Sequence, residues 1–258
     1  MSSILFEIKN SVAVITLNRP EKFNSFNREM ALLLQKILDD CATDKNTRSV
    51  YITGNGKAFC AGQDLAELSG DDAPGFEKIL SEHYNPIVSR IRKMEKPVVC
   101  AVNGVAAGAG ANIALCCDVV VATQSASFIQ AFSKIGLIPD SGGTYTLPRL
   151  IGFQKASALM MLGDKVSAAD AERMGMLYKV FADENFMEES MKIAETLSRM
   201  PTRGLAYTKQ ALNVSFHNSW EQQLEAEDKL QYAAAHTYDY NEGVHAFLEK
   251  RKPVFKGE

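Results

Sequence analysis

The sequence predicts an α/β fold, with a strand-and-helix core over residues 1–190 and a helical region over 191–258. Short runs rich in β-branched residues alternate with helical patterns in the first part of the chain. Strands separated by helices pair in parallel, because the helices serve as crossovers between them. From about residue 142 the pattern is mostly helical, which favours a separate helical region at the C-terminal end.

The composition is that of a globular protein with a sizeable core. The chain has 258 residues, of which 46% are hydrophobic and 23% are charged, and its net charge is −3. Lysine and arginine form no block, so nucleic acid is not expected as a partner. An anionic ligand is compatible with this composition, because backbone N–H groups and a few local cations can hold phosphate.

Five cysteines occur, at positions Cys41, Cys60, Cys100, Cys116 and Cys117. The odd number, the apolar surroundings of four of them and the lack of a C-x-x-C pair predict buried free thiols and no metal site. The start of the chain has neither a basic segment nor a long apolar run, and no stretch reaches the ~18 apolar residues of a membrane span. A cytoplasmic protein without membrane association is therefore expected.

The first half of the chain has clear local signals. The elements expected there are a strand pair over 4–9 and 12–18, a helix over 28–42, a strand over 49–53 and a helix over 76–95. Asn10-Ser11 suits the turn of a hairpin, and Asn27 suits an N-cap. Pro86 predicts an interruption or kink of the last helix, and the acidic segment 69–75 predicts a loop.

The second half continues with strands and helices and then becomes helical. The elements expected there are strands over 98–102 and 119–122, a helix over 108–117, helices over 184–199 and 202–216, and two more helices up to about residue 250. Asn103-Gly104 predicts a turn after the first of these strands.

Two glycine-containing segments are candidates for binding an oxyanion. Gly62-Gln63-Asp64 follows a strand-like run, so the Gln63 N–H is expected to point out of a strand–helix corner. Residues 104–115, GVAAGAGANIAL, allow close backbone approach and then open a helix with free N–H groups. If two such N–H groups converge, they can stabilise a thioester carbonyl that becomes an enolate. The alternative for each loop alone is tight packing. Neither segment fits a dinucleotide fingerprint or a phosphate-binding P-loop.

A third segment, residues 136–152, places Asp140 after Pro139 and before a helix. Asp140 is either a helix N-cap or an acid/base group. The preceding run 128–132 is largely apolar, so the carboxyl is expected at the edge of a dry pocket, where burial raises its pKa. The histidines are scattered without metal-ligand spacing, and no serine lies in a G-x-S-x-G turn.

Together these segments resemble the crotonase (enoyl-CoA hydratase/isomerase) superfamily. The resemblance runs from LNRPEKFNSFN (17–27) to EGVHAFLEKRKPVF (242–255). Its motifs are KAFCAGQDL (57–65), KPVVCAVNGVAAGAG (96–110), CDVVVAT (117–123), GLIPDSGGT (136–144) and LPRLIG (147–152).

The resemblance implies a spiral of ββα turns, C-terminal helices that mediate trimer or hexamer contacts, and an acyl-CoA substrate without a separate cofactor. It assigns the oxyanion hole to the N–H groups of Gln63 and Ala109. The CoA contacts that it assigns are Lys22, Phe23, Ala61, Gln63, Asp64, Leu65, Phe247 and Lys250, the last two often from a neighbouring subunit.

The resemblance also bears on the reaction. Enoyl-CoA hydratases of the family hold water between two glutamates, and the matching positions here are Asn112 and Phe132, which with Pro139 are expected to line the acyl pocket. Neither can act as an acid or base. Asp140 alone would then move a proton between two carbons, as in the similar branch of phenylacetate-degradation isomerases that act on ring 1,2-epoxyphenylacetyl-CoA, whose members also convert 3-enoyl to 2-enoyl thioesters.

Two alternatives remain open. The chain could hydrate enoyl-CoA, or it could bind acyl-CoA or a protein without catalysis. Dehalogenases of the superfamily use a nucleophilic Asp at a similar position, but no Trp precedes Pro139 to support that chemistry.

Overall fold

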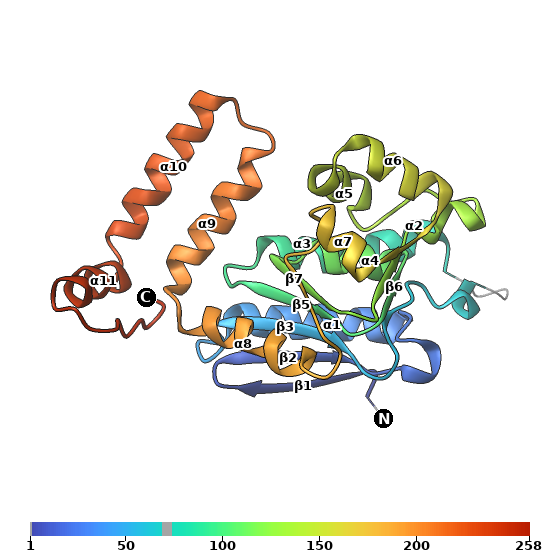
Figure 1. Cartoon of the computed structure of the whole chain (residues 1–258), viewed down its shortest axis with the longest axis horizontal. Helices are drawn as coiled ribbons and strands as arrows, with labels where there is room; N and C mark the ends of the chain where they lie inside the picture. The colour runs from blue at the N-terminus through green and yellow to red at the C-terminus, as the bar shows by residue number, and fades with distance from the viewer. Residues whose placement is uncertain (1, 69–73) are drawn as a thin grey trace.

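The computed structural model describes residues 2–68 and 74–258, so most of the expected acidic loop over 69–75 lies outside the described residues. Two sheets form the core (Figure 1). The large sheet contains, in spatial order, β1 (Ile4–Lys9), β2 (Val12–Leu17), β3 (Ser49–Gly54), β5 (Val98–Val102), β7 (Val119–Thr123) and β10 (Lys179–Phe181). The small sheet contains β4 (Ala58–Cys60), β6 (Val105–Ala107), β8 (Ser127–Ile129) and β9 (Lys165–Ser167).

The helices cover these sheets and form the C-terminal end. The α-helices are α1 (Arg28–Thr43), α2 (Phe76–Lys78), α3 (Asn85–Lys93), α4 (Ala109–Leu115), α5 (Gly143–Ile151), α6 (Phe153–Leu162), α7 (Ala168–Arg173), α8 (Phe186–Arg199), α9 (Thr202–Ser215), α10 (Trp220–Ala235) and α11 (Tyr238–Leu248). Short 3₁₀ helices are η1 (Pro20–Lys22), η2 (Leu65–Leu68) and η4 (Ala131–Ile135), and η3 (Ile79–Tyr84) is a π-helix.

The expected parallel pairing is confirmed. Strands β2, β3, β5, β7 and β10 pair in parallel in the large sheet, whereas the β1–β2 hairpin there is antiparallel. Each of β3, β5 and β7 is followed by a strand of the small sheet, namely β4, β6 and β8. The chain therefore winds between the two sheets as a crotonase-like spiral of ββα turns.

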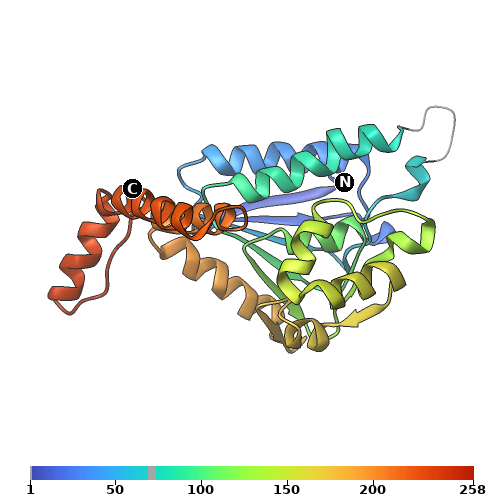
Figure 2. The same ribbon diagram turned by 90° about the horizontal axis from the view of Figure 1, so that it is seen from above.

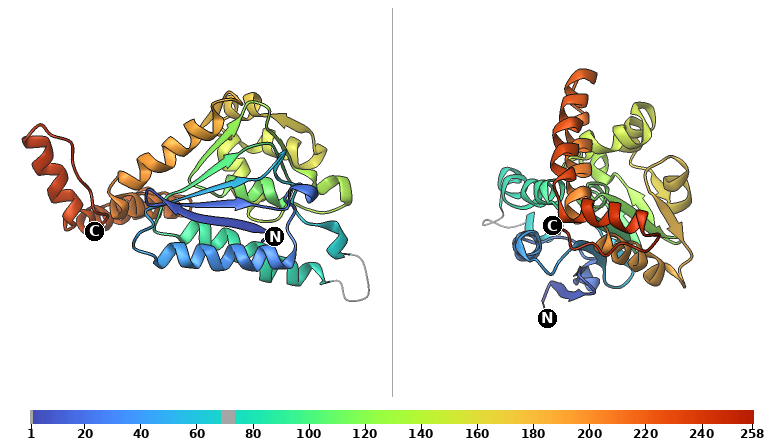
Figure 3. Two further views of the ribbon diagram at one scale, coloured as in Figure 1. Left: turned by 90° about the horizontal axis from the view of Figure 1, so that it is seen from below. Right: turned by 90° about the vertical axis from the view of Figure 1, so that its left-hand side faces the viewer.

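The large sheet is covered on both faces, as Figures 2 and 3 show. Val50 and Ile52 of β3 pack in the core cluster that includes the apolar face of α1 and residues of α3. Tyr51, between them, points to the opposite face, where it packs with Phe186 and Ala194 of α8. This alternation follows from the two-residue period of a strand. The buried hydroxyl of Tyr51 pairs with that of Ser190 at 2.8 Å.

Local turn and capping signals are confirmed. Asn10 and Ser11 both have positive φ, 51° and 60°, as a two-residue hairpin turn requires. The Asn27 side chain accepts a hydrogen bond from the Met30 N–H at the start of α1.

The interruption expected at Pro86 takes the form of π-helix η3, which ends two residues before it. Proline lacks an N–H, so the Glu82 carbonyl loses its usual partner four residues later. The Gln35 amide of α1 donates to this carbonyl at 2.8 Å and replaces that hydrogen bond.

Some expected boundaries were wrong. The helix expected over 108–117 is shorter, since α4 begins at Ala109 and ends at Leu115. Residues 105–107 before it form strand β6. The short strands β8, β9 and β10 were not expected. Each has three residues, which is too short for a clear period-two pattern.

Helices α9, α10 and α11 extend away from the sheets (Figure 1). Buried Lys209 of α9 anchors them through an ion pair with Asp118 at 2.7 Å and a hydrogen bond to the Ile91 carbonyl at 2.7 Å. The Arg48 guanidinium donates to the carbonyl oxygens of Phe255 and Met200. The division at residue 190 stays a prediction, and it falls within α8.

No helix in the described ranges, 2–68 and 74–258, is long and apolar enough to cross a membrane.

The corners between the sheets require small residues. A Cβ atom at Gly104 would lie 2.2 Å from the carbonyl oxygen of Lys57. We therefore expect Gly104→Ala to lower the free energy of unfolding by about 1–3 kcal/mol, because the backbone must shift. Urea unfolding measures the change. Gly75→Ala is the control, since among the described residues, its chain neighbours aside, no atom lies within 4 Å of a Cβ there. Equal stability of the two variants would contradict this account of the corner.

Candidate active site

Asp140 lies in a turn that precedes α5, but it does not cap that helix. The N-cap residue is Gly142, without a side-chain capping hydrogen bond. Instead, the Asp140 carboxyl accepts a hydrogen bond from the Ser141 hydroxyl at 2.8 Å. The N-cap interpretation of Asp140 is therefore wrong, and its carboxyl remains available for another role.

The surroundings of the Asp140 carboxyl favour its protonated form. Burial raises the pKa of Asp140 above its ordinary value of 3.8, and the Ser141 hydrogen bond lowers it only in part. A carboxyl with a raised pKa can both accept and return a proton near neutral pH. This is the shift expected for a carboxyl at the edge of a dry pocket.

The backbone of Asp140 is connected to α4. The Asn112 side-chain amide, fully buried, donates to the Asp140 carbonyl at 2.9 Å. Its oxygen accepts from the Gln130 amide at 2.8 Å. Both polar atoms of Asn112 are therefore engaged with protein groups.

The two glycine-containing loops lie against each other. A Cβ atom at Gly62 would be 3.4 Å from the Ala109 nitrogen and 3.0 Å from the Ala107 carbonyl oxygen. Among the described residues, neither the Gln63 N–H nor the Ala109 N–H donates to a protein acceptor. Two N–H groups from separate loops are thus free at neighbouring positions, as an oxyanion hole requires.

The Gln63 side chain is held by groups that the sequence did not single out. The Tyr84 hydroxyl donates to the Gln63 side-chain oxygen at 2.7 Å, and the Gln63 amide donates to Glu67 at 3.2 Å. Burial is the main cause that raises the pKa of Tyr84 well above 10.0, and nearby Cys60, Asp140 and Glu67 raise it further. Tyr84 therefore stays a neutral hydrogen-bond donor close to Asp140.

The other positions expected in the acyl pocket differ in exposure. The Phe132 ring is buried and lies 3.8 Å from the position of a Cβ atom at Gly108, next to Ala109. Pro139 is half-buried and precedes Asp140 in the same turn. The structure thus brings Asn112, Phe132 and Pro139 to the region between the oxyanion loops and Asp140.

Several residues expected to bind CoA share one region of the surface. The Ala61 N–H donates to the Phe23 carbonyl at 3.0 Å, so the two segments that contain them run together. Lys22, Phe23, Ala61 and Leu65 are all exposed. Asp64 is less accessible.

Asp64 pairs with Arg19 at 2.8 Å. Burial raises the pKa of Asp64, but the Arg19 hydrogen bond and charge, with the Ala66 N–H, lower it below the ordinary value. Asp64 therefore helps to hold the loop between β4 and η2.

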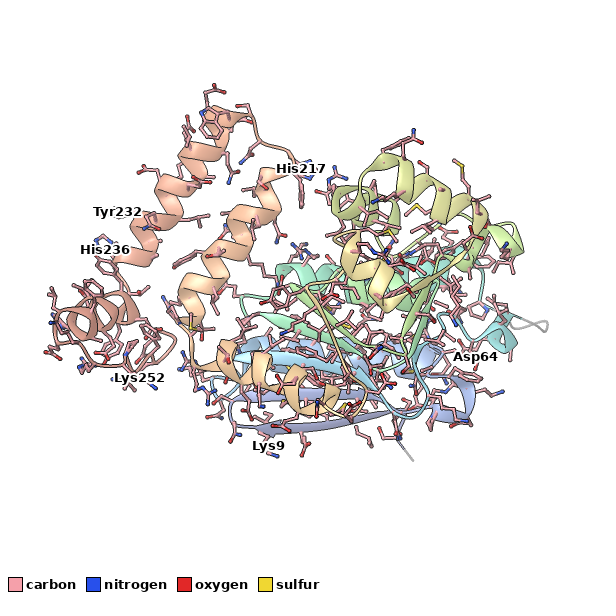
Figure 4. The ribbon with its side chains drawn as sticks, in the orientation of Figure 1. Lys9, Asp64, His217, Tyr232, His236 and Lys252 are labelled. Atoms are coloured by element: carbon pink, nitrogen blue, oxygen red, sulfur yellow. The ribbon has the colours of Figure 1, made fainter. Side chains whose placement is uncertain are left out.

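Phe247 and Lys250 lie elsewhere. Phe247 is 83% exposed near the end of α11. Figure 4 places Lys252, which follows Lys250, at the opposite end of the molecule from Asp64. The structure therefore does not bring these two positions together with the other residues expected to bind CoA.

Comparison with known proteins adds to this geometry. Residues 7–258 match the model of the family described as enoyl-CoA hydratase/isomerase. A 1,2-epoxyphenylacetyl-CoA isomerase from Escherichia coli is 46% identical, with both chains fully covered. A 2,3-dehydroadipyl-CoA hydratase from Escherichia coli is 35% identical, again over both full lengths. This chain belongs to the enoyl-CoA hydratase/isomerase family.

Solved structures of this family show the same fold. The crystal structure of an enoyl-CoA hydratase from Bacillus anthracis superimposes with a TM-score of 0.93, at 33% identity, and covers 99% of this chain and 100% of that one. The chain is therefore an enzyme of the enoyl-CoA hydratase/isomerase superfamily with the crotonase fold, as the motifs predicted.

All five cysteines of this family member are buried free thiols, as expected. The residues that the structure describes contain no group of three or more His, Cys, Asp or Glu side chains able to hold a metal ion.

The sequence interpretation missed three residues of this site, Tyr84, Gln130 and Ser141. Gln130 carried a signal, because it is the polar residue within the largely apolar run 128–132. Ser141 was visible only as the neighbour of Asp140. Tyr84 gave no local signal, since it meets Gln63 only through tertiary packing.

Burial of Asp140 has a consequence for stability. Because its pKa is raised on folding, the folded protein retains a proton that the unfolded chain releases above 3.8. Stability contributed by the protonated form is therefore lost as pH rises from that value through the folded pKa.

We expect Asp140→Asn to remove this loss. The melting temperature of the variant should exceed that of the wild type at neutral pH, and the difference should shrink toward acid pH. Melting curves on both sides of the folded pKa measure it. Exposed Asp164→Asn is the control. A difference that grows toward acid pH would contradict the assigned direction of the shift.

Proposed function

We propose that this chain is an acyl-CoA isomerase in which Asp140 transfers a proton between two carbons of the acyl group. The observation that carries the proposal is a half-buried carboxyl with a raised pKa. Its turn is hydrogen-bonded to α4, and this helix begins at Ala109, one of the two adjacent free N–H groups. Asn112 and Phe132 occupy the positions where the resemblance to hydratases places catalytic glutamates. The proposed substrates are a 3-enoyl-CoA, converted to 2-enoyl-CoA, and ring 1,2-epoxyphenylacetyl-CoA.

In the proposed reaction on a 3-enoyl-CoA, ionised Asp140 removes a proton from the α carbon. The electron pair of that C–H bond passes into the thioester, whose oxygen becomes an enolate held by the N–H groups of Gln63 and Ala109. The neutral carboxyl then returns its proton to the γ carbon, and the double bond forms between the α and β carbons. The carboxyl ends the cycle ionised, so the reaction consumes no other reagent.

The contacts of the neighbouring residues argue against water activation. Hydration needs groups that position a water molecule and move its proton. Both polar atoms of Asn112 already contact protein groups, and Phe132 is apolar and buried. Glu67 is another carboxylate near Tyr84, but its oxygens accept from the Arg28 N–H and the Gln63 amide. Asp140 is thus the favoured proton carrier among the described carboxylates.

Hydration is the second candidate, because this chain is similar both to relatives named as isomerases and to relatives named as hydratases. The isomerase named above, at 46% identity, supports isomerisation and a ring-bearing acyl group. The hydratase at 35% identity keeps addition of water to an enoyl-CoA as the alternative.

CoA enters this proposal as part of the substrate. The proton transfer changes no oxidation state of an enzyme group, so we propose no separate cofactor. Phe247 and Lys250 support a homotrimer or homohexamer, in which they would contact CoA bound to another copy. The buried free thiols are consistent with a proposed cytoplasmic location.

We expect Asp140→Asn to lower the kcat for isomerisation of a 3-enoyl-CoA by about 10²–10⁴-fold, because the amide cannot accept the proton. KM should change little, since the oxyanion and CoA contacts remain. Formation of the 2-enoyl-CoA chromophore measures the rate, and exposed Asp164→Asn should retain it. Wild-type turnover by Asp140→Asn would exclude the proposed role of Asp140.

The isomerase and hydratase hypotheses are separated by their substrates. We expect the purified enzyme to convert a 3-enoyl-CoA to the 2-enoyl-CoA and to leave crotonyl-CoA largely unchanged. Loss of the enoyl absorbance of crotonyl-CoA measures hydration. Rapid loss, together with slow conversion of the 3-enoyl-CoA, would establish a hydratase. If a 3-enoyl-CoA incubated with the enzyme in heavy water gained no deuterium at its α carbon, the chain would instead be a non-catalytic binding protein.

A further inference from the structure

One face of α4 holds the turn that carries Asp140. Asn112 of α4 and Cys116, the C-cap residue that follows the helix, both contact this segment. The Asn112 amide donates to the Asp140 carbonyl at 2.9 Å, and the Cys116 thiol donates to the Ser141 carbonyl at 3.4 Å. The Ala109 N–H lies at the start of the same helix. Helix α4 is thus in contact with both parts of the proposed catalytic apparatus.

The conformation of this turn needs support from outside. Ser141 has a φ of 51°, in the left-handed region, which costs a non-glycine residue about 1–2 kcal/mol. Gly143 gives the Asn112 amide access to the turn, because a Cβ atom at Gly143 would lie 2.3 Å from the Asn112 side-chain nitrogen. The Asn112 amide therefore occupies space that any other residue at position 143 would fill.

The orientation of the Asn112 amide depends on Gln130. The Asp140 carbonyl can only accept a hydrogen bond, so Asn112 must present its NH₂ group to it. The Asn112 oxygen then faces Gln130, whose NH₂ group donates to it at 2.8 Å. If the Asn112 amide group were rotated by 180°, its side-chain oxygen would face the Asp140 carbonyl oxygen, and this hydrogen bond would be lost.

This arrangement leaves one polar atom unpaired. The side-chain oxygen of Gln130, which is 5% exposed, has no hydrogen-bond partner among the described residues. A buried unpaired acceptor costs about 1–3 kcal/mol. An apolar residue at this position would avoid that cost but could not donate to the Asn112 oxygen, so the glutamine serves the orientation of the Asn112 amide.

We propose that Gln130 is a positioning residue of the reaction: it fixes the Asn112 amide, which in turn sets the backbone of Asp140 relative to the Ala109 N–H. The inference rests on the proposed proton transfer by Asp140. Gln130 itself does not touch the reacting atoms in this scheme. It acts entirely through Asn112.

Gln130→Met tests this role with little change of volume. The variant removes the unpaired Gln130 oxygen, but it leaves the Asn112 oxygen without its donor. Because one unpaired oxygen replaces another, we expect the melting temperature to stay close to that of the wild type. We expect kcat for 3-enoyl-CoA isomerisation to fall roughly 10–100-fold, because small displacements of a catalytic group are costly. KM should be unchanged, since the oxyanion and CoA contacts are intact. Exposed Gln154→Met is the matched control and should keep wild-type kcat.

A double-mutant cycle separates positioning from general packing. In an Asn112→Ala background, Gln130→Met should change kcat by less than about twofold, because the group through which Gln130 acts is gone. Equal losses in both backgrounds would overturn the proposal, and so would wild-type kcat for Gln130→Met alone. If Asn112→Ala does not fold, Asn112→Ser provides the second background.

Asp140→Asn, assayed in parallel, distinguishes failure of this inference from failure of the proposed function. Inactive Asp140→Asn with fully active Gln130→Met would overturn only the positioning role. Fully active Asp140→Asn would overturn the proton transfer and the positioning role together.

Discussion

The hydrogen bond from the Asn112 amide to the Asp140 carbonyl joins the two halves of the site. One half consists of the free N–H groups of Gln63, at the corner after β4, and Ala109, at the start of α4. The other is a carboxyl in a turn before α5, far away in sequence. A thioester enolate requires a proton carrier and an oxyanion site in fixed relation, because misplacement of either raises the barrier. Helix α4 supplies that fixed relation directly.

Close backbone approach makes this arrangement possible. Gly62 lies against the Ala109 nitrogen, Gly104 lies against the Lys57 carbonyl, and Gly143 leaves room for the Asn112 amide. A side chain at any of these positions would separate segments whose polar groups must meet. The same glycines that allow the chain to wind between the two sheets therefore also allow the site to form.

The site also contains features that cost stability. The half-buried Asp140 carboxyl has a raised pKa, Ser141 adopts a left-handed conformation, and the Gln130 oxygen has no hydrogen-bond partner among the described residues. These three features lie in or beside one turn. Left-handed residues also occur at the Asn10-Ser11 hairpin, and unpaired buried atoms also occur at His83 and Ser127. Features that cost stability beside a candidate proton carrier are expected where geometry serves catalysis.

The sequence by itself determined the family, the parallel order of the main strands, and elements with strong local signals, such as the Asn10-Ser11 turn and the Asn27 cap. It also indicated Asp140 as a candidate proton carrier. Only the tertiary structure decided that Asp140 is not a helix cap, that three-residue strands complete the sheets, and that Gln130 and Tyr84 belong to the site. Local patterns record the preferences of neighbouring residues. Contacts between side chains distant in sequence depend on which faces meet when the sheets and helices pack.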